Sequence, residues 1–111
     1  MDPRRERPDN PARPMTEQIR TLTAEIRALI DEPTAPLSVL EDTLTTGYAR
    51  ALELERERGR LERRLGEVAA EGDGELAQEL AERVSYADDH IARLRSLLEK
   101  LRERAAAARA A

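Results

Sequence analysis

The chain has 111 residues, a formal net charge of −4 and 38% charged residues, with no cysteine, tryptophan or phenylalanine. This length fits one small domain. Two tyrosines and five glycines leave little material for a β-sandwich, a barrel or a deep apolar pocket, whereas the abundance of Ala, Leu, Glu and Arg is typical of coiled coils and long helices. The missing cysteines exclude a disulfide framework and a thiolate metal site. We therefore expect an all-α protein.

Signals for export, membranes or nucleic acid are missing from the sequence. It contains no secretory signal and no run of about 18 apolar residues that could span a membrane, so we expect a cytoplasmic protein without a membrane partner. Acidic and basic residues interleave along the chain, as on an ion-paired, solvated surface. Because a nucleic-acid-binding protein usually presents one basic face, we do not expect nucleic acid as a partner.

Residues 1–14 contain four prolines, four arginines and almost no apolar side chain. Such a segment cannot bury enough apolar surface to offset the entropy lost on ordering, so we expect a disordered leader. The alternative is a proline-rich arm that binds a partner in an extended conformation. Residues 15–111 should then form a single helical domain.

A short first helix is predicted at residues 16–31. Thr16 is a good N-cap, and the apolar residues that follow are spaced by three and four, which places them on one helical stripe. This stripe consists of Ile19, Leu22, Ile26 and Leu29. Pro33 and Pro36 end the helix, because proline lacks an amide hydrogen and disfavours helical geometry in the residue before it.

Two long helices should follow, at residues 35–71 and 74–108. From Leu37, eight of ten positions spaced alternately by three and four are apolar, and from Ala77 all ten are. This spacing is the heptad pattern of a coiled-coil seam. Between the two helices, Gly72 suits a left-handed helix end and Asp73 suits the N-cap of a new helix.

If the chain reverses at Gly72 and Asp73, the residue numbers of facing seam positions always sum to 145. Gly47 then faces Leu98, and many other layers also set a small residue against a large one, as close packing requires. The sequence therefore predicts an antiparallel two-helix coiled-coil hairpin, with arms of about 50 Å from the helical rise per residue.

Further apolar, aromatic and small residues lie outside the seam and form a predicted interaction surface. It comprises Tyr48, Leu52, Gly59 and Gly66 on the second helix and Tyr86, His90 and Leu97 on the third. We expect the first helix to cover part of the second-helix face, near Tyr48, and to be too short to reach around to Leu97. The uncovered remainder indicates self-association or a protein partner, and a homodimer resembling a four-helix bundle is the simpler hypothesis.

Gly59 and Gly66 lie seven residues apart on this face. A glycine in an exposed helix interior costs about 1 kcal/mol relative to alanine. The pair therefore indicates that another backbone approaches closely there, and the alternative is that it reflects composition alone.

Arg58 is the only charged residue in either seam, where it faces Ala87. Glu55, Glu62 and Asp88 are within helical or cross-helix reach. The structural interpretation is that this polar seam residue pairs locally and penalises slipped registers. The functional alternative is that its guanidinium binds an anionic ligand.

His90 is the only histidine, so a metal site is not predicted. A di-metal site in a helical bundle needs a Glu-x-x-His step on two helices, and Ala87 stands where that glutamate would be. We expect His90 to flank the seam near Glu57, where it could titrate near neutral pH. No cofactor or catalytic residue is predicted either, because the sequence has no phosphate-binding loop, nucleophile elbow or zinc spacing.

Together these features predict a non-enzymatic protein that acts through protein–protein contacts, as a regulator, adaptor or assembly factor, and that forms a homodimer. The alternative is a small-molecule sensor in which an anionic ligand binds near Arg58.

Overall fold

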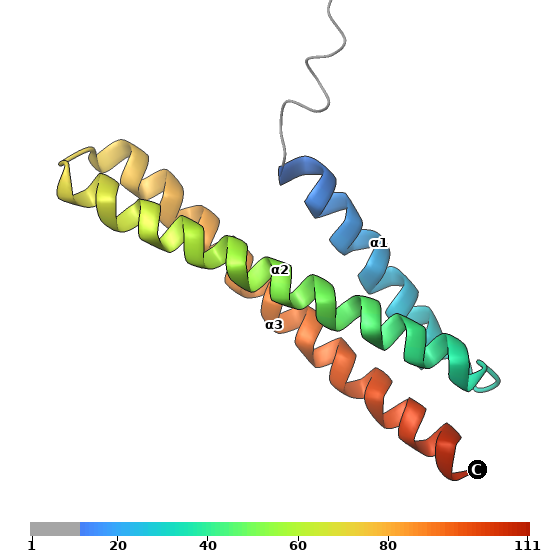
Figure 1. The fold of residues 1–111 in the computed structure, drawn as a ribbon. Coiled ribbons are helices and arrows are strands. Elements are labelled where there is room, and N and C mark those ends of the chain that lie inside the picture. Colours follow the sequence, from blue (N-terminus) through green and yellow to red (C-terminus); the bar gives the residue numbers. More distant parts are fainter. Residues whose placement is uncertain (1–11) are drawn as a thin grey trace, which may run out of the picture.

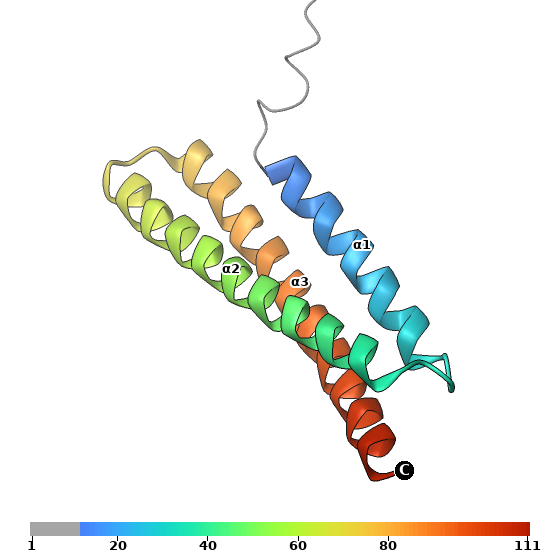
Figure 2. The same ribbon diagram turned by 45° about the vertical axis from the view of Figure 1, so that its right-hand side comes forward.

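The structure, a computed structural model, describes residues 12–111. It contains three helices, α1 (Ala12–Ile30), α2 (Leu37–Ala70) and α3 (Gly74–Ala110). The long helices α2 and α3 pack antiparallel as a hairpin, and α1 lies beside the half of the hairpin that is remote from the α2–α3 turn (Figures 1 and 2). The predicted all-α hairpin with a short N-terminal helix is confirmed.

The turn between α2 and α3 forms as its sequence predicts. Gly72 has a φ of 85°, a left-handed conformation that glycine adopts without steric cost. The Asp73 carboxylate then accepts a hydrogen bond from the backbone N–H of Leu76 at 3.1 Å, which satisfies one of the free amides at the start of α3. The ends of the two long helices consequently lie within two residues of their predicted positions.

The first helix begins earlier than predicted, at Ala12 rather than Thr16. Residues 12–14 therefore belong to α1, whereas residues 1–11 of the expected leader lie outside the described part of the chain. Pro14 falls in the first turn, where a backbone N–H has no helical partner. A proline at this position removes no hydrogen bond and does not delay the start of the helix.

The main core lies where all three helices meet. Its buried members come from the α1 stripe, from the seams of α2 and α3, and from Leu97 beside the seam: Ile19, Leu22, Ile26, Leu40, Leu44, Ala51, Leu54, Leu94, Leu97, Leu98, Leu101 and Ala105. Gly47 lies directly against the Leu98 side chain, which occupies the space that a Cβ atom would need. This contact confirms the predicted register at that layer.

The half of the hairpin nearest the turn, residues 58–87, consists of α2 and α3 alone and is called the distal hairpin below. Val68 and Leu80 are its buried residues, at 2% and 4% exposure. Its other seam residues are only half-buried: Leu61, Leu65, Ala77, Val84 and Ala87. Two helices by themselves enclose a seam on two sides only, so the distal hairpin keeps part of its apolar surface in contact with solvent.

The predicted position of α1 is wrong. This helix packs mainly on α3, and Leu97 is only 8% exposed, whereas Leu52, on the second-helix face that α1 was expected to cover in part, is 49% exposed. The physical reason is the burial of Leu97 next to the core residues Leu94 and Leu101, because burial is favourable in proportion to apolar area. The Arg104 guanidinium also donates a hydrogen bond to the backbone carbonyl of Glu32, just beyond α1.

Candidate interaction surface

Ion pairs connect α2 with α3 on the side of the hairpin that faces away from α1, called the open flank below. Arg95 binds Glu55 at 2.6 Å, and near the chain end Arg109 binds Glu41 at 2.9 Å. In both pairs the residue numbers sum to 150, which is the regular spacing expected beside the seam of an antiparallel coiled coil. These pairs indicate the same register as the apolar seam.

Arg58 lies at the edge of the seam rather than inside it, with a side-chain exposure of 32%. Its Nε donates to Asp88 at 2.5 Å, and a terminal nitrogen donates to Glu62 at 2.9 Å. The hydrogen bond and charge of Asp88, followed by the charge of Glu62, raise the pKa of the guanidinium above its ordinary value. Glu55, the third acidic residue predicted to lie within reach of Arg58, accepts hydrogen bonds from Arg95.

This polar group carries a net negative charge. It contains the carboxylates of Glu55, Glu62 and Asp88 and the guanidiniums of Arg58 and Arg95. Three acids beside two bases disfavour the binding of an anion, because the added charge would meet a group that is already negative overall.

His90 lies on the flank that α1 covers, so its predicted position on an uncovered face is wrong. Its ring packs edge-to-face on Tyr86, with the ring centroids 4.5 Å apart. Burial is the main cause that lowers the His90 pKa, and the positive charges of Arg93 and Arg20 lower it further, while Asp89 opposes them. Nowhere in the described range do three metal-binding side chains come together.

Gly59 and Gly66 face open space. A Cβ atom at Gly66 would meet nothing within 4 Å, and one at Gly59 would meet only the Arg63 guanidinium at 3.7 Å. No other segment of residues 12–111 therefore approaches either glycine. The predicted close approach of a second backbone stays a prediction about another molecule.

The remaining predicted surface residues divide between the two flanks. On the open flank, Leu52 is 49% exposed, and Tyr48 is half-buried against the core. On the opposite flank Tyr86 is 56% exposed, whereas Leu97 belongs to the core. Leu52 and Tyr86 are thus two large apolar side chains of similar exposure on opposite flanks.

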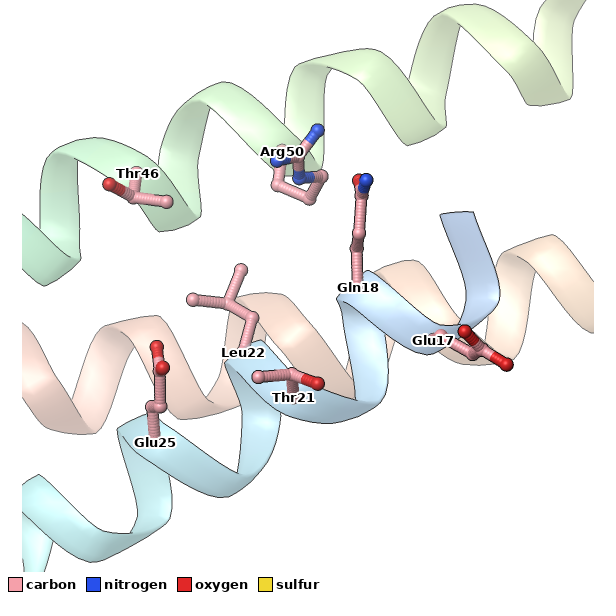
Figure 3. Close-up of a pocket in the computed structure, with 7 residues that line it drawn as sticks. All are labelled: Glu17, Gln18, Thr21, Leu22, Glu25, Thr46 and Arg50. Atoms are coloured by element: carbon pink, nitrogen blue, oxygen red, sulfur yellow. The ribbon is translucent and has the colours of Figure 1, made fainter. Parts of the chain in front are cut away.

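A shallow groove of about 450 Å³ lies between α1 and α2 (Figure 3). This groove is not among the features predicted from the sequence. Gln18 and Leu22 project from α1 toward α2, where Arg50 lies (Figure 3). Six of the seven residues that line it are of polar types, and Leu22 is the apolar one: Glu17, Gln18, Thr21, Leu22, Glu25, Thr46 and Arg50. The groove exists because α1 packs mainly on α3, so no pattern of residue types in the sequence marks it.

Two further observations bear on function. No helix in the described part of the chain is both long enough and apolar enough to cross a lipid bilayer. Comparison of the chain with protein-family models, with curated proteins and with solved structures gives no match.

Proposed function

We propose that this protein acts through protein–protein contacts, as a regulator, adaptor or assembly factor, and that it forms a homodimer through its open flank, from Leu52 along the distal hairpin. The observation that carries the proposal is the half-buried seam of this region, at Leu61, Leu65 and Val84. A second pair of helices would complete a four-helix arrangement there. Full burial of one leucine contributes roughly 1.5 to 3 kcal/mol.

The exposed surface next to this seam supports the same proposal. Leu52 lies beside it at 49% exposure, and Gly59 and Gly66 leave room for another backbone. Each glycine weakens the isolated helix by about 1 kcal/mol relative to alanine. Close contact with another molecule gives these residues a physical role that the single chain does not.

A second copy of the chain is the partner that the charges favour. The open flank carries both signs close together, with Arg58 and Arg95 beside Glu62 and Asp88. In a two-fold symmetric dimer each flank meets its own copy. A mixed-charge flank can meet itself without net repulsion, whereas a one-signed flank would repel its copy.

The test is the molar mass in solution, measured by light scattering from about 1 to about 100 µM, because association depends on concentration. We expect wild-type protein to show twice the chain mass. Leu52→Glu should give the monomer mass without loss of helicity, because its side chain is already half exposed.

Tyr86→Glu provides the matched control, since it introduces the same charge on the other flank at a similarly exposed residue. This variant should keep the dimer mass. Wild-type protein that stays monomeric over the whole range would contradict the homodimer. A dimer lost only in Tyr86→Glu would show that the opposite flank forms the contact.

A further inference from the structure

His90, the only histidine of the chain, lies on α3 two helical turns before Leu97, which belongs to the core shared with α1. The two helices run in the same direction along the hairpin (Figure 2). Arg20 of α1 lies close enough to His90 for its charge to act on the ring. The state of this one side chain therefore depends on whether α1 is in place.

The His90 ring cannot accept a second proton without cost in this position. Its Nε2 atom is shielded from solvent and has no hydrogen-bond partner. Both ring nitrogens of an imidazolium are donors, so the charged form would hold a buried N–H without an acceptor. Such an unpaired buried donor is unfavourable.

Two of the three charges that act on the ring also oppose its protonation. Arg93 on α3 and Arg20 on α1 both oppose a positive ring, and Asp89 on α3 favours it. On α2 the hairpin register sets Glu57 at about this level, but its carboxylate binds Arg60 at 2.5 Å. Removal of α1 would take the positive charge of Arg20 away from the ring, and this change favours protonation.

We propose that His90 is a proton-sensitive latch whose protonation releases α1 from the hairpin. Release would uncover Leu97 together with the α1 residues Ile19, Leu22 and Ile26, all of which are buried when α1 is in place. The latch would hold this apolar surface covered more firmly at neutral pH than in mild acid.

The direction follows from proton linkage. The folded-state pKa of His90 is lowered, so the released state binds more protons as the pH falls below the ordinary histidine value of about 6.5. Docking of α1 is therefore strongest above that value and weakens as the pH falls from there through the folded pKa. Each unit by which docking lowers the pKa changes the docking equilibrium by about tenfold.

Hydrogen exchange of the α1 amides, corrected for intrinsic rates, tests the latch at about pH 7.5 and about pH 5.5, on either side of the ordinary pKa of histidine. We expect the protection of residues 19–30 to fall several-fold at the lower pH in wild-type protein. In His90→Gln, which cannot be charged, protection should be the same at both pH values.

A titration of the His90 ring protons by NMR tests the same proposal without a change in the chain. The wild-type pKa should lie below the ordinary value, and Arg20→Gln should raise it. Arg27→Gln removes the same charge from α1 at a position that does not act on the ring, so it should leave the pKa unchanged. A wild-type pKa at or above the ordinary value would overturn the proposal, as would α1 protection that does not change with pH.

Discussion

Gly47 shows how a single missing side chain sets the distance between two helices. Leu98 fills the space in front of it, and both residues are buried. Helix propensity alone would favour alanine at this position. Packing therefore selects glycine here against the preference of the isolated helix.

Alanine substitutions at Gly47 and Gly66 should have opposite effects on stability. Gly47→Ala places a Cβ where Leu98 lies, and overpacking a core of this kind costs about 1 to 3 kcal/mol. Gly66→Ala meets nothing within 4 Å and should gain up to about 1 kcal/mol from helix propensity. Urea denaturation of each variant at a fixed protein concentration checks both signs.

Each of these two glycine substitutions is the control for the other, because both exchange glycine for alanine in the same helix. Stabilisation by Gly47→Ala would mean that Leu98 moves aside freely. Destabilisation by Gly66→Ala under monomeric conditions would contradict the open space seen at that residue.

Individual elements differ in how far the sequence could predict them. The α2–α3 register follows from signals that are local or repeated, namely the Gly72–Asp73 turn and a heptad pattern that recurs in every layer. The side on which α1 packs was predicted wrongly. An antiparallel helix pair has two grooves, and the connection between α1 and α2 allows the chain to enter either one.

The partners of the polar residues were predicted only in part. The sequence identified Asp88 and Glu62 as partners of Arg58, because both lie within one helical turn or one seam layer. It could not predict that Glu55 would bind Arg95 instead. Competition between several nearby charges is decided by side-chain geometry, which residue spacing does not specify.

The observed position of α1 predicts which of two leucines tolerates a charge. Leu97→Glu should strongly lower the melting temperature, because it places a carboxylate in the three-helix core, where Leu97 is 8% exposed and an unpaired charge is costly. Leu52→Glu should change the melting temperature little once the protein is monomeric. Circular dichroism melts at low concentration measure both. Similar melting temperatures for the two variants would contradict the position of α1.

At the scale of the whole molecule, the core and the turn lie at opposite ends. The three-helix core lies near the α1–α2 connection, whereas the hairpin closes at Asp73, in the distal half where the seam is only half-buried. A contact between α2 and α3 closes a short loop when it lies near the turn and a long loop when it lies at the end of the hairpin remote from the turn. The entropic cost of closing a loop rises with its length.

These two ends should control different rates. Asp73→Ala, which removes the N-cap at a cost of about 1 kcal/mol, should mainly slow folding, because the turn region can form first. Leu101→Ala in the core should mainly speed unfolding. Stopped-flow folding and unfolding measurements in urea separate the two effects. The same rate changed by both variants would show that the two ends form together.

The position of the turn has a consequence for the newly made chain. Because α3 is translated after α1 and α2, α2 has no partner for its seam until the residues after Gly74 emerge, and the α1 stripe lacks the α3 surface on which it packs. The apolar seam of α2 is therefore uncovered until α3 has been made. The charged residues interleaved along both long helices would help to keep this intermediate soluble until the hairpin closes.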